Sequence, residues 1–170
     1  MRTTPTHVFF WGDKDIYSNF HSSRFSDGER HYSCAEQCFM RSKAMFFGDH
    51  ATADRIMGPG RPYDYKKLGR QVAGYDDALW TQQRVAAMEQ ACLLKFKSNP
   101  GLLEQLLATG TRILVEASPY DRVWGVGLGE NDPRLDDQSQ WRGENLLGQV
   151  LMSVRTTLAL DLPRPSRLAP

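Results

Sequence analysis

Two stretches of the chain carry carboxyl, lysine and tryptophan side chains at spacings that suit acid–base chemistry. In the first, over 115–129, Glu116 closes a short apolar run, and Asp121 and Trp124 follow within one loop. Pro119 indicates a turn between them, because proline fixes its own φ and moves the preceding residue out of the helical region. Two carboxylates beside an indole indicate a concave site that binds a flat ring and transfers protons. A strand, a tight turn and a core tryptophan are the alternative for the same residues.

Glu36 and Lys43 form the second stretch. They are seven residues apart on a helix expected from Ser33 to about 47, so they share one face of it. Ser33 and Glu36 also fit a capping box, in which Glu36 would only satisfy backbone amides at the start of the helix. Lys43 is either a solvated surface lysine or, because its neighbours are apolar, a partly buried amine with a lowered pKa and raised nucleophilicity.

Three further features are compatible with ligand binding, and each has a plain structural alternative. The basic run of Lys66, Lys67 and Arg70 is either a solvated helix face or a clamp for phosphate groups. Trp80, near the start of a long expected helix, is either a core residue or a ligand contact. Asn145 is either the N-cap of the last helix or a group that hydrogen-bonds a sugar hydroxyl.

The residue pattern predicts a mainly α scaffold with a few short strands for these candidates. Buried strands are expected at 7–11 and 113–115, with a hairpin turn at 27–28 before a short strand over 29–32. Helices are expected over 33–47, 49–57, 64–73, 76–97, 102–108 and from about 145 to 160. We expect one domain over 7–160, with tails at 1–6 and 161–170.

Composition indicates one globular domain and excludes several function classes. The 170 residues carry a formal net charge of +1, so no overall basic field recruits nucleic acid. The three cysteines and four histidines lack metal-ligand spacing, and the glycines at 125, 127 and 129 do not match the dinucleotide fingerprint. No apolar run is long enough for a membrane span, and no signal peptide is recognisable. We therefore expect a cytoplasmic monomer without metal or cofactor.

Seven motifs carry a resemblance to a known family. They are S-N-F at 18–20, A-E-Q at 35–37, K-A-M-F-F-G-D at 43–49, K-L-G-R at 67–70, K-F-K-S-N at 95–99, T-G-T-R-I-L-V-E-A-S-P-Y-D-R-V-W-G at 109–125 and W-R-G-E-N-L-L-G-Q-V-L-M at 141–152. In this order and spacing the chain resembles the NADAR family, also called YbiA-like, over roughly residues 7–160. The resemblance implies a small, mainly helical domain that hydrolyses N-glycosidic bonds.

The resemblance also implies two possible substrate classes. Some family members split ribosylamino-pyrimidine phosphates of the riboflavin pathway, and these often carry S-E-H-Y-F-Q where this chain has C-A-E-Q-C-F-M. Others remove ADP-ribose from guanine in DNA, and the A-E-Q motif is more similar to theirs. We therefore expect ADP-ribosylated guanine in DNA as the substrate and ADP-ribose as the product. A small ribosylated heterocycle is the alternative substrate, and a non-catalytic ADP-ribose-binding module is the alternative of another class.

The resemblance and the residue chemistry together give an expected site. The catalytic set is Glu36, Lys43, Glu116 and Asp121. A carboxylic acid would protonate the departing base and a carboxylate would stabilise the sugar or activate water, or Lys43 would attack the anomeric carbon and form a Schiff base. The order of these roles stays open. The expected substrate-binding residues are Ser18, Asn19, Phe20, Lys67, Arg70, Trp80, Ser118, Trp124, Gly125 and Asn145.

Overall fold

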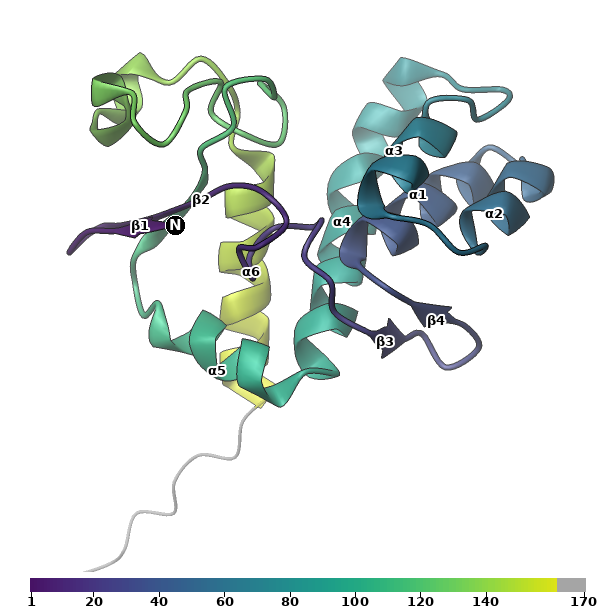
Figure 1. The fold of residues 1–170 in the computed structure, drawn as a ribbon, viewed down its shortest axis with the longest axis horizontal. Coiled ribbons are helices and arrows are strands. Elements are labelled where there is room, and N and C mark those ends of the chain that lie inside the picture. The colour runs from purple at the N-terminus through teal and green to yellow at the C-terminus, as the bar shows by residue number, and fades with distance from the viewer. Residues whose placement is uncertain (162–170) are drawn as a thin grey trace, which may run out of the picture.

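A computed structural model describes residues 1–161, and six α-helices with a few short strands form this part of the chain, in agreement with the expected mainly α fold (Figure 1). The helices are α1 (Ala35–Phe46), α2 (His50–Ile56), α3 (Pro62–Gly69), α4 (Asp77–Lys97), α5 (Pro100–Ala108) and α6 (Leu146–Asp161), with short 3-10 helices at Pro133–Asp136 and Gln138–Gln140. Of the tail expected at 161–170, residue 161 ends α6 and the rest lies outside the described residues. None of the helices of residues 1–161 combines the length and apolar character of a membrane span.

A three-stranded sheet joins the two halves of the chain. Its order is β1 (Arg2–Thr3), β2 (His7–Phe10) and β5 (Ile113–Glu116), with β1 antiparallel and β5 parallel to β2. The segment 1–6 therefore contains a strand where a polar tail was expected. Backbone pairing with β2 and the Arg2 guanidinium, 4.3 Å from the centre of the Phe9 ring, hold it in place. A second sheet is the hairpin of β3 (Phe25–Ser26) and β4 (His31–Tyr32).

The long helices α4 and α6 pack against each other and form the centre of the molecule, between the three-stranded sheet and the group α1–α3 (Figure 1). The main core contains fully buried Phe10 from β2, Phe96 from α4, Leu114 from β5 and Leu151 from α6. Because β5 packs on α6 and α1 packs on α4, this core fixes the end of β5 relative to the start of α1.

The helix ends confirm some capping predictions and correct others. Asp76 caps α4 as expected, since its side chain accepts from the backbone N–H of Leu79 at 2.9 Å. The capping box of Ser33 and Glu36 is wrong, because Cys34 is the N-cap residue of α1 and Ser33 donates to the side chain of Gln37 instead. The α3 helix begins at Pro62 rather than at 64, which suits proline because the first helical residue needs no N–H partner.

Candidate active site

The helices α1, α3 and α4 and the loops that follow β2 and β5 surround a cavity of about 730 Å³. A volume in this range suits a ligand of drug-like size. The cavity brings together residues that are far apart in the sequence. The expected site residues that line it are Ser18, Asn19, Phe20, Glu36, Lys43, Arg70, Trp80, Glu116, Ser118, Asp121 and Trp124.

Glu36 lies on the first turn of α1 and is buried, with only 2% of its surface exposed. Its Oε2 accepts a hydrogen bond of 2.5 Å from the side-chain amide of Asn19, whereas its Oε1 has no partner within residues 1–161. Burial raises the pKa of Glu36 from its ordinary 4.5 to about 7, and the positive charge of Lys66 and the Asn19 hydrogen bond only partly offset this. Glu36 is therefore divided between its two protonation states near neutral pH.

Glu116 is the last residue of β5 and reaches the cavity from the sheet. Burial raises the pKa of Glu116 to about 8, repulsion from Asp121 and Glu36 adds to the rise, and Lys66 reduces it. Its Oε2 has no hydrogen-bond partner in the described part of the chain. Glu116 therefore keeps its proton at neutral pH, so the cavity holds a neutral carboxyl beside a second carboxyl of intermediate charge.

Asp121 orders the loop that follows β5. Its Oδ1 accepts from the backbone N–H groups of Val123 and Trp124 at 2.9 and 2.8 Å, and its Oδ2 lies 3.9 Å from Nζ of Lys66. Lys66 thus acts on Glu36, Glu116 and Asp121, although it was not among the expected substrate-binding residues.

Lys67, which was expected in the site, does not line the cavity, and its side chain is exposed. The rotation of α3 explains why Lys66 lines the cavity and Lys67 does not. Lys66 lies on the same helix face as Tyr63 and Arg70, which also line the cavity. Gly69 fixes this rotation, since its contact with the Met40 side chain leaves no room for a Cβ.

Lys43 is half-buried at the far end of α1 from Glu36. Its Nζ donates to the backbone carbonyl of Gly69 at 2.9 Å and lies 3.9 Å from the centre of the Tyr75 ring. Burial lowers the pKa of Lys43, and the charges of Asp77 and Glu36 oppose that effect. The lowered pKa agrees with the interpretation of Lys43 as a partly buried amine, and the solvated surface lysine is the alternative that the structure contradicts.

A match to known proteins decides the family. The model of the NADAR domain matches residues 9–159. The chain belongs to the NADAR family. It is 36% identical to an N-glycosidase of Acanthamoeba polyphaga mimivirus in an alignment of 163 residues. The alignment covers 89% of this chain and 96% of that protein. The chain is also 37% identical to protein irg-1 of Caenorhabditis elegans, over 91% of this chain and 81% of that one.

The fold agrees with a solved structure of the same family. The NMR structure of YbiA from Escherichia coli superposes with a TM-score of 0.77 at 24% identity and covers 99% of this chain and 94% of that one. Relatives named for an enzymatic activity are N-glycosidases, which are hydrolases of N-glycosyl compounds. Family membership gives the chain this enzyme class.

The loop of this NADAR domain that carries Asn19 depends on a residue that the sequence reasoning missed. Lys95 of α4 is fully buried, and its Nζ donates to the carbonyl oxygens of Ile16 and Ser18 at 2.6 and 2.8 Å. Lys95 therefore fixes the backbone directly before Asn19, whose side chain donates to Glu36. The signal was present in the sequence, because Lys95 follows Met88 and Cys92 on the buried face of the helix.

The tryptophans of the cavity are partly structural. Trp80 is buried, and its ring centre lies 5.4 Å from that of Phe39, whose other face meets Trp124 edge-on at 5.2 Å. All three rings of this aromatic cluster line the cavity. The cluster forms an apolar part of the cavity wall. Elsewhere on the wall, the Lys66 ammonium nitrogen lies 5.6 Å from the centre of the Phe20 ring.

Gly125 and Asn145 do not line the cavity, although both were expected to bind the substrate. Asn145 is buried with φ 54°, and its side chain accepts from the N–H of Glu116 at 3.0 Å and donates to the carbonyl of Leu114 at 2.9 Å. These bonds occupy the amide that was expected to reach a sugar hydroxyl. Gly125 packs against the Glu116 carbonyl, where a Cβ would lie 2.9 Å away. Both residues position the end of β5, so they act on the site through Glu116.

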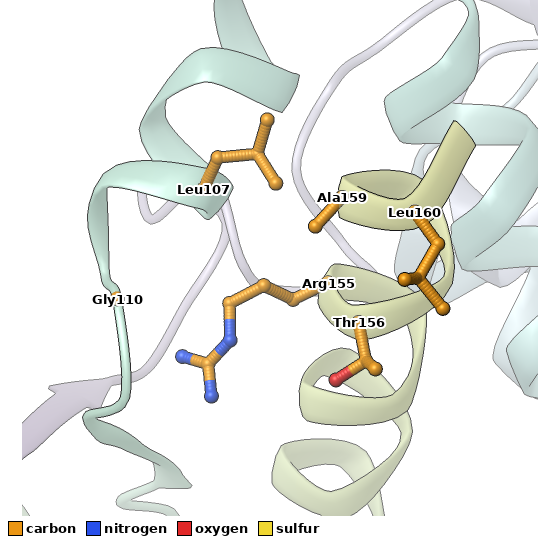
Figure 2. Close-up of a pocket in the computed structure, with 6 residues that line it drawn as sticks. All are labelled: Leu107, Gly110, Arg155, Thr156, Ala159 and Leu160. Atoms are coloured by element: carbon orange, nitrogen blue, oxygen red, sulfur yellow. The ribbon is translucent and has the colours of Figure 1, made fainter. Parts of the chain in front are cut away.

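A second cavity, of about 370 Å³, lies between α5 and α6 (Figure 2). Arg155 is the charged residue on its wall, and its guanidinium already donates to the Thr109 hydroxyl and to the Arg112 carbonyl at 2.7 and 2.8 Å. The lining contains neither a carboxyl group nor any expected site residue. Within residues 1–161, no group of three or more His, Cys, Asp or Glu side chains has an arrangement that could hold a metal ion.

Proposed function

We propose that this chain hydrolyses the N-glycosidic bond between ADP-ribose and a guanine base of DNA. The observation that carries the proposal is a pair of carboxyl groups in the same cavity, the buried Glu36 and the partly buried Glu116, with raised pKa values and one free oxygen each. Glycoside hydrolysis needs such a pair, one group to protonate the leaving group and one to stabilise or attack the sugar side. We also propose that the enzyme acts as a monomer, because residues of a single chain supply both carboxyl groups of the pair.

The environments of the two carboxyl groups favour different roles. Glu116 keeps its proton up to a pH of about 8, so it is the proposed acid that protonates the departing base. Glu36 accepts a hydrogen bond from Asn19, which favours its charged form, and it is the proposed carboxylate that stabilises the sugar cation or activates water. Asp121 has both its oxygens engaged with the loop amides and with Lys66, so we assign it a positioning role.

Lys43 offers a second route to the same bond cleavage. In this route its neutral amine attacks the anomeric carbon, the base leaves with a proton from Glu116, the ribose ring opens to a Schiff base, and water then releases the sugar and regenerates the amine. Borohydride reduction during turnover traps a Schiff base as an adduct of ADP-ribosyl mass on Lys43. We expect no adduct and almost no turnover in Lys43→Arg, because arginine keeps the charge but cannot act as the amine. Substantial turnover in this variant, without any adduct, would leave water as the attacking group.

The charges around the cavity support a phosphorylated substrate. Lys66 and Arg70 reach it from α3, Arg84 from α4 and Arg122 from the loop after β5. Cations on several walls suit a diphosphate flanked by two sugars, whereas a ribosylamino-pyrimidine phosphate carries one phosphate group. The size of the cavity also favours the larger ligand.

A side-by-side assay tests the proposed substrate. The chain is incubated with DNA that carries ADP-ribosylated guanine and, separately, with a ribosylamino-pyrimidine phosphate. We expect release of ADP-ribose from the DNA, and the Glu116→Gln variant serves as the inactive control. Faster hydrolysis of the pyrimidine would assign the chain to the riboflavin-type substrate, and binding of ADP-ribose without hydrolysis of either would indicate a binding module.

A further inference from the structure

Arg84 is a partly buried cation of the cavity without a full set of partners. It lies one helical turn after Trp80 on α4, lines the cavity, and has a side chain that is 18% exposed. Its Nη2 lies 3.8 Å from Oε2 of Glu144, which is too long for a hydrogen bond. Its Nε is buried, and no acceptor within residues 1–161 reaches it. A buried donor without an acceptor costs free energy, so its persistence at a cavity wall suggests that a ligand completes it.

The other unsatisfied atoms point to the same cavity. Among the described residues, four buried side-chain polar atoms lack a hydrogen-bond partner: Nε of Arg2, Oε1 of Glu36, Nε of Arg84 and Oε2 of Glu116. All of these except the Arg2 atom belong to residues that line the cavity. The two carboxyl oxygens have proposed roles in bond cleavage. The Nε of Arg84 is therefore the one remaining unsatisfied atom among the described residues that line the cavity.

Arg84 and the carboxyl pair reach the cavity from different elements. Glu36 lies on α1 and Glu116 ends β5, whereas Arg84 lies on α4. The start of α4 also carries Asp77, whose Oδ1 accepts from the Tyr75 hydroxyl at 2.6 Å. The Tyr75 ring in turn lies 3.9 Å from Nζ of Lys43. A ligand that places its glycosidic bond at the carboxyl pair can therefore also contact the α4 wall and Arg84.

We propose that Arg84 binds a phosphate group attached to the ribosyl part of the substrate, and that Glu144 releases the guanidinium when this phosphate binds. The inference rests on the proposed function, because it takes the ligand to be a ribosyl phosphate. A guanidinium can donate from Nε and from one terminal nitrogen to two phosphate oxygens, which satisfies the buried Nε. Glu144 is 56% exposed, so its carboxylate returns to water at little cost.

Calorimetric titration of the intact chain with ADP-ribose and with ribose 5-phosphate tests the inference. We expect Arg84→Lys to weaken ADP-ribose binding roughly 10-fold or more, because lysine keeps the charge but cannot replace the Nε donor. We expect Glu144→Gln to tighten binding a few-fold, since it removes the competing carboxylate. Adenosine, which has no phosphate, should bind equally to both variants and to the wild type. Ribose 5-phosphate shows whether one phosphate suffices or whether the diphosphate is required.

Arg61→Lys is the matched control, because Arg61 is exposed and does not line the cavity. Thermal unfolding of each variant checks that the fold is intact. Equal affinity of wild type and Arg84→Lys for both phosphate ligands would overturn the inference, as would weaker binding in Glu144→Gln. DNA turnover is measured in parallel. Binding that depends on Arg84 without release of ADP-ribose from DNA would contradict the proposed function and support the phosphate site, whereas turnover with unchanged binding would contradict the phosphate site alone.

Discussion

The carboxyl groups of the cavity contrast with those of the loop between β5 and α6. In that loop, Asp132 accepts hydrogen bonds from both the side chain and the backbone N–H of Arg134, and Asp137 accepts from the hydroxyl and the N–H of Ser139. These bonds lower the pKa of both aspartates. In the cavity, burial raises the pKa of Glu36 and Glu116, and the only hydrogen bond to either carboxyl group within residues 1–161 comes from Asn19.

This difference separates two kinds of carboxyl group. The charged groups of the loop stabilise the fold, whereas the folded environment of the cavity disfavours the charged form of its glutamates. The charged form of Asp132 is favoured by folding, whereas the charged forms of Glu36 and Glu116 are disfavoured. Packing elsewhere, above all of α4 against α6, has to supply the stabilisation that the cavity lacks. Strongly perturbed carboxyl groups in a cavity are therefore the ones to test for function.

The largest expected effect is on turnover. Replacing either cavity glutamate by glutamine keeps its size but removes proton transfer, so we expect Glu36→Gln and Glu116→Gln each to lower turnover by roughly 10²–10⁴-fold. Asp132→Asn should stay within a few-fold of the wild type. Steady-state release of ADP-ribose from modified DNA measures all three. Near-normal turnover in either glutamine variant would remove that residue from the catalytic set.

The next effect concerns the two adjacent lysines of α3. Lys66→Ala removes a cation close to the cavity carboxyl groups, so we expect it to weaken substrate binding by roughly 10–100-fold. It should also shift the alkaline limb of the pH–rate profile upward, because Lys66 lowers the pKa of both Glu36 and Glu116. Lys67→Ala should change neither quantity, since Lys67 is exposed outside the cavity. Equal effects of the two substitutions would contradict the rotation of α3 described above.

The third effect is on stability, and its sign depends on pH. The folded-state pKa of Glu116, about 8, is above its ordinary 4.5. Its contribution to stability is therefore fully present below pH 4.5 and is lost as the pH rises through about 8. We expect Glu116→Gln to be more stable than the wild type at pH 9, by up to about 5 kcal/mol for a pKa that rises from 4.5 to about 8, with the two equal near pH 4. Urea unfolding at both values measures the difference, and a constant difference across this range would contradict the raised pKa.

The smallest expected effect is a loss of stability at neutral pH when Asp132 of the loop between β5 and α6 is replaced. Because its pKa is lowered below the ordinary 3.8, Asp132 contributes stability above that pH and loses it on further acidification. Asp132→Asn should therefore lower the melting temperature slightly at pH 7 and have less effect below pH 3. Calorimetry at the two pH values checks this. A stabilising effect at pH 7 would remove the distinction between the two sets of carboxyl groups.

Local sequence signals predicted the elements and much of the cavity lining. The cap at Asp76 and the helix spacing of Glu36 and Lys43 are local properties, and both were predicted from the sequence. The position of Glu116 at the end of a buried apolar run was also visible. These predictions succeeded because each depends on residues within a few positions of each other.

The remaining site residues depend on contacts between distant segments. Asn145 looks like a helix cap in the sequence, and only the packing of α6 on β5 shows that its amide is occupied by that strand. The choice between Lys66 and Lys67 depends on the contact of Gly69 with Met40. The helix spacing places Lys95 on the buried face of α4, but its acceptors come from residues 16 and 18, so its contacts do not follow from the helix alone.

The parallel pairing of β2 with β5 has a consequence for the synthesis of the enzyme. Phe10 of β2 is paired with Glu116 of β5, so β2 cannot form this pairing until most of the chain has left the ribosome. A nascent chain that has released only α1–α4 contains Glu36 and Lys43, but the wall that carries Glu116 and Asp121 does not yet exist. Contacts of such large sequence separation also form late in folding, because closing a long loop costs entropy. An interrupted translation product of this kind would therefore be inert, and glycosidase activity would begin only with the nearly complete polypeptide.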